Sequence, residues 1–129
     1  MLSKIFRVLL VLMFVSPILG TLGIFPAPTP DMYHTAQAYD FIMMLMNTGY
    51  IMWLMAAVFL ICLVLTIMNR MAAVALLILP ITLNIVGFHL FLDGGLFTAG
   101  AIMGNVLFLI NIYFLWKNRS TYKVLLNKN

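Results

Sequence analysis

The charged residues of this chain are sorted by position: basic side chains flank its apolar runs at alternate ends, and acidic side chains occupy the remaining connections. The basic residues are Lys4, Arg7, Arg70, Lys117, Arg119, Lys123 and Lys128, and the acidic residues are Asp31, Asp40 and Asp93. Threading the chain back and forth four times brings every basic segment to one side of a bilayer. Basic loops are typical of the cytoplasmic side. We therefore expect a multi-pass protein with four spans and both termini in the cytoplasm.

The composition favours the same class. Hydrophobic residues make up 65% of the chain and charged residues 8%, too few to cover the surface of a water-soluble domain. The 129 residues suffice for four spans of about 20 residues each and short connections. We expect one all-α domain over residues 1–129, a four-transmembrane-helix bundle. Nucleic acid is excluded as a partner because the basic residues stand singly or in pairs beside spans. The single cysteine, Cys62, excludes an intrachain disulfide.

The apolar runs predict spans at about residues 5–24, 50–68, 71–92 and 97–116. The nearly continuous apolar stretch 41–67 would form a helix of roughly 40 Å, longer than a hydrocarbon core of about 30 Å. Its one local breaker is Asn47-Thr48-Gly49. We therefore predict a separate outer-leaflet or re-entrant helix over about residues 30–46, with Thr29 as its N-cap and Pro30 at its first position.

An alternative makes the first apolar run a cleaved secretory signal, because Lys4 and Arg7 provide a basic start. The region Ser16–Gly20 lacks a clear small-x-small cleavage pattern. We therefore prefer a retained first span.

Four segments carry a resemblance to a known family: Asn47-Thr48-Gly49-Tyr50, the turn Met68-Asn69-Arg70, residues 80–93 (PITLNIVGFHLFLD) and the tail 115–123 (LWKNRSTYK). In these segments the chain resembles the DoxX-like family of small bacterial integral membrane proteins. The resemblance implies a four-helix bundle in the bacterial inner membrane. Founding members are linked to membrane-bound thiosulfate:quinone oxidoreduction. Many relatives carry a glutamate midway along the second span, where this chain has Phe59, so a proton-coupled redox role does not transfer directly.

Polar residues inside or beside spans supply the candidate ligand-binding or proton-handling groups. They are Asn84, His89, Asp93, His34 and Asp40. Asp93 follows His89 by four residues, one helical turn, so its carboxylate can accept a hydrogen bond from the imidazole. The competing interpretation is a helix-end pair with a purely structural role. We expect a functional site, if the protein has one, at the outer end, where these residues and the Asn47–Gly49 break would converge.

A second group of residues predicts helix packing. Gly100 and Gly104 form a Gly-x-x-x-Gly pair that permits close backbone approach, and Asn111 follows on the same face. Asn84, Asn105 and Asn111 are also candidates for interhelical hydrogen bonds.

No metal site is predicted, because the chain has no His-x-x-x-His or Glu-x-x-His spacing. Bis-histidine haem is disfavoured because the two histidines of the chain, His34 and His89, are expected at different depths in the membrane. The methionines of residues 43–55 are typical of flexible packing around a break. We predict no cofactor.

Three functions remain open. The first is a non-catalytic or accessory component of a membrane complex, favoured because the chain lacks a nucleophile–base pair, phosphate loop or dithiol. The second is a subunit of a quinone-linked membrane oxidoreductase. The third, a small-solute transporter, would need paired broken helices, and only one break is present. The expected partners are the lipid bilayer, a membrane or redox protein, and a quinone or other lipophilic ligand.

Overall fold

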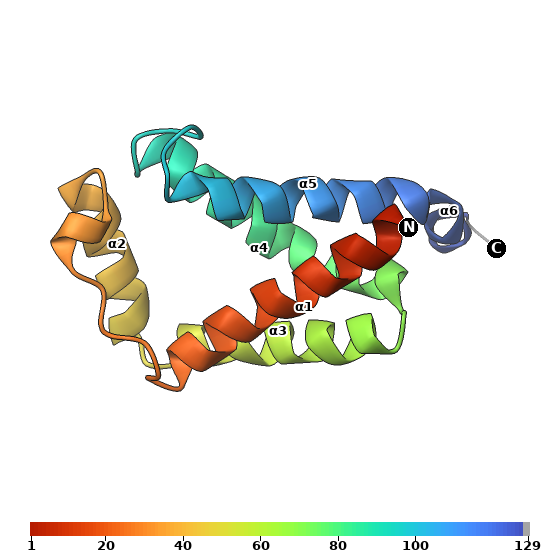
Figure 1. Cartoon of the computed structure of the whole chain (residues 1–129), viewed down its shortest axis with the longest axis horizontal. Coiled ribbons are helices and arrows are strands. Elements are labelled where there is room, and N and C mark those ends of the chain that lie inside the picture. Colours follow the sequence, from red (N-terminus) through yellow and green to blue (C-terminus); the bar gives the residue numbers. More distant parts are fainter. Residues whose placement is uncertain (128–129) are drawn as a thin grey trace.

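The computed structural model describes residues 1–127, and this part of the chain is all-helical. Its elements, in order, are α1 (Leu2–Thr21), the 3-10 turn η1 (Pro30–Met32), α2 (Ala36–Asn47), α3 (Ile51–Ile67), α4 (Met71–Phe91), α5 (Ala101–Lys117) and α6 (Arg119–Leu126) (Figure 1). The expectation of an all-α fold is confirmed.

The helices pack as two pairs, α1 on α3 and α4 on α5, and contacts between α3 and α4 join the pairs. The shared core contains Leu10 and Phe14 from α1 and Phe59 from α3. The rings of Phe14 and Phe59 lie 5.7 Å apart. Phe59 is therefore a packing residue in this chain.

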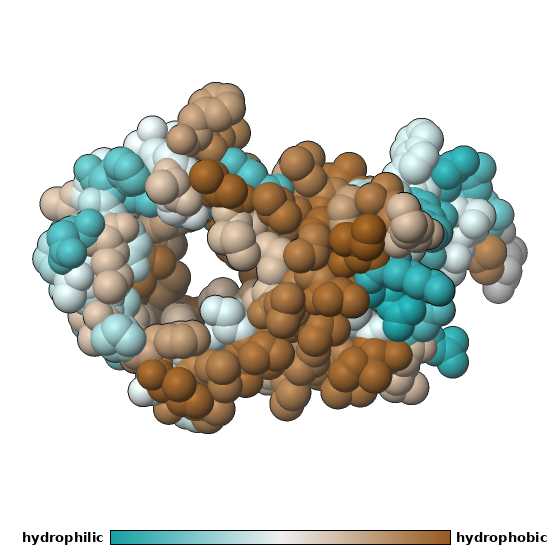
Figure 2. All heavy atoms as spheres, viewed as in Figure 1, coloured by the Kyte–Doolittle hydropathy of each residue, from teal (hydrophilic) through white to brown (hydrophobic). Residues whose placement is uncertain are grey.

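The outer surface of the pairs is apolar. Large side chains such as Leu12, Leu60 and Leu109 are exposed, and Figure 2 shows hydrophobic residues covering the middle of the molecule. A continuous apolar surface of this kind marks contact with membrane or protein. In residues 1–127, α1 and α4 are each long and apolar enough to cross a membrane, the bent pair α2 and α3 can supply a third span, and α5 is a shorter apolar helix.

The break predicted at Asn47–Gly49 is confirmed. Helix α2 ends at Asn47, α3 begins at Ile51, and the two axes meet at 84°. Gly49 has φ +75°, a left-handed conformation that glycine adopts without steric cost. As a result, α2 stands across one end of the helix pairs (Figure 1).

Several predicted boundaries were wrong. The helix expected from residue 30 begins at Ala36, because the Thr35 hydroxyl accepts a hydrogen bond from the Ala38 backbone N–H (3.0 Å). Thr29 precedes only the short turn η1 and makes no side-chain cap bond. The first long helix covers residues 2–21 where a span was expected at about 5–24, and α5 begins at residue 101 where the last span was expected from about 97. Helix α6 was not predicted.

The charges separate to opposite ends of the fold. The Arg7 guanidinium donates to the Thr66 carbonyl (3.0 Å), and Ser3 and Tyr113 share a hydrogen bond of 2.7 Å, so the start of α1 meets the ends of α3 and α5. We call this the cationic end; its basic residues are Lys4, Arg7, Arg70, Lys117, Arg119 and Lys123. The opposite, acidic end contains Asp31, Asp40 and Asp93. Lys128 lies outside the described residues.

Candidate functional site

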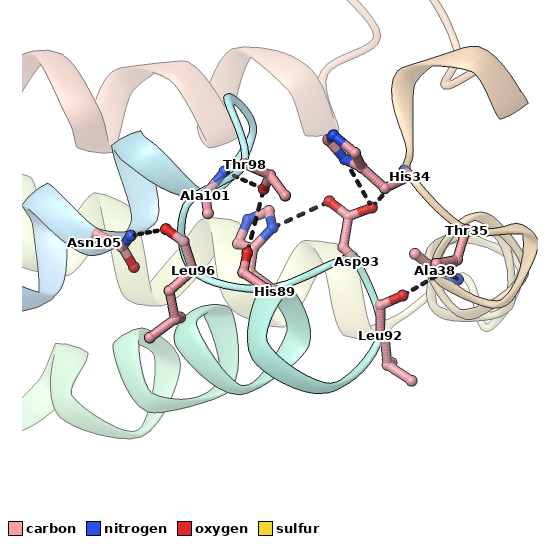
Figure 3. A network of polar contacts seen from close by, with 11 residues as sticks. His34, Thr35, Ala38, His89, Leu92, Asp93, Leu96, Thr98, Ala101 and Asn105 are labelled. Carbon is pink, nitrogen blue, oxygen red and sulfur yellow. Dashed lines mark hydrogen bonds and ion pairs between the residues drawn. The ribbon is translucent and has the colours of Figure 1, made fainter.

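The centre of the acidic end is the carboxylate of Asp93, in the turn after α4. Asp93 is only 2% exposed. One oxygen, Oδ1, accepts the backbone N–H of His34 (2.8 Å), and the other, Oδ2, lies 3.1 Å from Nδ1 of His89 (Figure 3). The His34 ring is also near, with Nδ1 3.7 Å from Oδ1. A buried carboxylate thus has a partner for each oxygen, as burial of a charge requires. We call His34, His89 and Asp93 the histidine–aspartate cluster.

Backbone conformation places Asp93 there. Gly94 and Gly95 have φ +84° and +107°, and the Gly95 N–H donates to the His89 carbonyl (2.8 Å), which ends α4 in a tight turn. The Asn105 amide of α5 donates to the Leu96 carbonyl (2.6 Å) and ties the turn to the next helix. The two glycines and Asn105 therefore fix the direction of the carboxylate.

A second set of contacts anchors the start of α2 to α4. The Thr35 hydroxyl donates to the Leu92 carbonyl. The ring of Phe88 stacks on Phe41 at 5.9 Å and meets the edge of Tyr33 at 6.3 Å. Helix α2 is thus held at its beginning by α4 and at its far end by the turn into α3.

The surroundings shift the pKa values of two groups at this end, Tyr33 and Asp31. Burial raises the pKa of Tyr33, and the negative charge of nearby Asp93 raises it further. The pKa of the exposed Asp31 carboxyl is lowered, first by a hydrogen bond from the Thr29 side chain. Tyr33 therefore remains a neutral hydroxyl at physiological pH.

His89 is the group of this cluster best placed for chemistry. Its side chain is 12% exposed, and its ring edge lies against α5, near Gly100 and Gly104. When Nδ1 carries the proton, it donates to Asp93 and leaves Nε2 as an acceptor. A carboxylate that orients an imidazole in this way is a recurring arrangement for proton transfer, and it is equally suited to joining two helix ends.

Two of the sequence candidates lie apart from the cluster. Asn84 is exposed, and its amide donates to the Pro80 carbonyl of its own helix (3.0 Å). Asp40 is exposed on α2 and forms no ion pair within residues 1–127. The Asn47–Gly49 break is at the other end of α2 from His34. Of the residues expected to converge, the structure brings together His34, His89 and Asp93, and Tyr33 joins them.

Thr35 and Phe88, which complete the attachment of α2, were missed. Thr35 had only a weak signal, because it is a good N-cap residue six positions before the apolar stretch 41–67 but Thr29 is an equally good one. Phe88 had none, since an aromatic residue in an apolar span is unremarkable in sequence.

The packing residues lie at the interface of α4 and α5. A Cβ atom added to Gly104 would come within 2.5 Å of Ile85 Cγ2, so α4 approaches α5 closely there. Asn111 is fully buried, donates to the Ala75 carbonyl (2.8 Å) and accepts a hydrogen bond from Thr82 (3.1 Å). Gly100 faces the histidine–aspartate cluster: a Cβ atom added to Gly100 would lie 3.6 Å from Cε1 of His89.

Two further features bear on function. Figure 2 shows an opening through the molecule between α2 and the ends of the other helices. In the described chain, no group of three or more histidine, cysteine, aspartate or glutamate side chains is arranged to hold a metal ion.

The chain matches no protein-family model, no curated protein and no solved structure. The site is therefore interpreted from its own geometry.

Proposed function

We propose that this chain is a non-catalytic or accessory component of a membrane complex, related to the DoxX-like proteins. The histidine–aspartate cluster then has a structural role: it fixes the position of α2 so that this helix can contact the partner. The observation that carries the proposal is that each carboxylate oxygen of Asp93 already has a partner within the chain. Both carboxylate oxygens bind groups of this chain, one on the segment before α2 and one on α4. A carboxylate committed in this way orders a surface rather than receiving a substrate.

In this proposal the protein crosses the bilayer four times, through α1, α3, α4 and α5, with both termini in the cytoplasm of a bacterial cell. Helices α3 and α5 have 17 residues each, which corresponds to about 26 Å and lies within the range of about 17–25 residues for spans. The basic residues gathered at one end support the orientation. Helix α2 then lies along the outer membrane interface.

Reporter fusions after Asn129 and within the Pro26–Pro30 segment test this arrangement. We expect the first reporter to indicate a cytoplasmic position and the second to indicate a periplasmic position. A periplasmic signal at the C-terminus would mean that one of the four helices does not cross.

Purification from native membranes in mild detergent, followed by mass spectrometry, tests the accessory role. We expect a membrane protein to co-purify in a fixed ratio with the wild type and to be lost from Asp93→Ala, which releases α2. Asp40→Ala is the matched control, since it removes an unpaired carboxylate from the same end. A monomeric protein without any partner would refute the proposal.

The opening beside α2 favours one second candidate, a subunit that binds quinone for a membrane oxidoreductase. The opening lies beside α2, the helix that follows the cluster, and the Nε2 atom of His89 has no hydrogen-bond partner among residues 1–127, although this edge of the ring packs toward Gly104 of α5. Organic extraction of the purified protein followed by chromatography would detect bound quinone. In this case we expect about one quinone per wild-type protein and none in the His89→Ala variant. If the wild type, purified without extra detergent washes that could strip lipids, contains no quinone, this candidate is excluded.

A further inference from the structure

The cationic end holds positive charge that nothing in the described chain neutralises. Among residues 1–127, no lysine or arginine forms an ion pair. Arg7 binds the carbonyls that end α3, and Arg119 binds the Trp116 carbonyl (3.1 Å) and lies 4.6 Å from the Trp116 ring. These contacts orient the guanidinium groups without cancelling their charge. No acidic residue among residues 1–127 therefore supplies the counter-charge of this end.

A groove of about 450 Å³ lies at this end, between the start of α4 and helix α6. Its volume falls in the range of roughly 300–1,000 Å³ that is typical of ligand sites. The polar part of its wall includes Asn69, Arg70 and Thr121, and the apolar part includes Leu76 and Leu125. The groove thus combines one charged residue, Arg70, with an apolar wall.

Arg70 is the charged group of this groove that remains available. The Tyr122 hydroxyl already donates to the Ala72 carbonyl (2.9 Å), and the Asn118 amide donates to the Phe114 carbonyl (2.8 Å). The Arg70 side chain is exposed and forms no hydrogen bond or ion pair with any described residue. Its guanidinium can therefore bind an anion without breaking an existing contact.

Helix α6 indicates the depth at which the groove opens. It carries Arg119 and Lys123 together with three exposed apolar residues, Val124, Leu125 and Leu126. A short helix with both kinds of surface, next to apolar spans, lies at the level of the lipid headgroups. Phosphate groups are the anions found at this level, with acyl chains directly beneath them.

We propose that the groove between α4 and α6 seats one anionic phospholipid, whose phosphate binds Arg70 and whose first acyl carbons lie along Leu76 and Leu125. Guanidinium binds phosphate through two parallel hydrogen bonds. A zwitterionic lipid brings its own ammonium group and leaves the charge of this end unbalanced. The site is independent of the histidine–aspartate cluster and of the accessory role.

Native mass spectrometry of the full-length protein in neutral detergent tests the site, with phosphatidylglycerol and phosphatidylcholine as the two probes. We expect the wild type to bind one phosphatidylglycerol about tenfold more tightly than phosphatidylcholine, and Arg70→Gln to lose this preference. The matched control is Lys123→Gln, which removes the same charge from α6 but does not line the groove. It should retain the preference.

A second variant separates the groove from general electrostatic attraction. Ala73→Phe fills the groove without changing any charge, and we expect it to abolish the bound lipid while circular dichroism shows an unchanged helix content. Equal weakening by Arg70→Gln and Lys123→Gln, or retention of the lipid by Ala73→Phe, would overturn the proposal. Displacement of the lipid by millimolar inorganic phosphate would also overturn it, because the site would then recognise a free anion.

Discussion

The two ends of the molecule use charge in opposite ways. At the acidic end, each oxygen of the buried Asp93 carboxylate has a hydrogen-bond partner within the chain, the His34 backbone N–H and the His89 ring. At the cationic end, six described basic residues have no acidic partner. The acidic end therefore uses its charge to join segments of the protein, and the cationic end leaves its charge for the surroundings.

This difference follows from burial. A charge that is removed from water needs a partner in the fold, because an unpaired buried ion costs several kcal/mol or more. Exposed lysines and arginines need none, and their attraction to headgroups is worth about 1 kcal/mol each. Substitutions at the acidic end should therefore change stability, whereas substitutions at the cationic end should mainly change interactions with lipid.

The largest effect is expected for Asp93→Ala. The change leaves the His34 N–H and the His89 ring without their acceptor, and we expect a loss of about 3 kcal/mol in the free energy of unfolding. Denaturation in detergent followed by circular dichroism measures it. Asp40→Ala, an exposed carboxylate at the same end, should stay within about 0.5 kcal/mol. Similar losses for the two variants would mean that Asp93 is not the centre of this end.

Gly104→Leu should follow, with a loss of about 2 kcal/mol from overpacking. The new side chain would collide with Ile85 and push α4 from α5 directly below His89. Thermal unfolding in detergent provides the measurement. Ala101 is fully buried and is therefore unsuitable as a control, whereas Met103→Leu on the exposed face should change little. A stable Gly104→Leu protein would show that the rigidity of the acidic end does not depend on this interface.

At the cationic end, the largest stability effect belongs to Arg7, the residue that binds the C-terminal carbonyls of α3. Arg7→Gln removes a positive charge from the negative end of the helix dipole, and we expect a loss of about 1 kcal/mol. Lys4→Gln, one turn earlier and without a partner, is the matched control in the same unfolding experiment. A loss as large as that of Asp93→Ala would break the contrast between the two ends.

The sequence allowed the segregated charges and the break after α2 to be predicted, because both depend on local chemistry. The start of α2 could not be predicted, since Thr29 and Thr35 are both good caps. Only the fold shows that the Thr35 side chain meets both Ala38 and Leu92. Helix α6 has eight residues, too few for a hydrophobic period to identify it.

The site was predicted in part. Asp93 is four residues from His89, which corresponds to about 40° around the helix, so their pairing could be read from spacing. Asn84 is five residues from His89, about 140° away around the helix, so spacing argued against its inclusion. The contact with His34 could not be predicted, because it depends on where the 84° bend carries α2.

The smallest effect is therefore expected for Asn84→Leu. Its amide binds only the Pro80 carbonyl of its own helix and lies on the exposed face, where leucine is well suited to lipid. We expect the free energy of unfolding to change by less than about 0.5 kcal/mol, and partner or quinone retention to equal that of the wild type. His89→Ala, in the same helix, is the comparison and should reduce both. If Asn84→Leu instead matches His89→Ala, the functional surface extends around α4 to its exposed side, and the contrast between an acidic end that pairs its buried charge and a cationic end that does not would no longer describe the molecule.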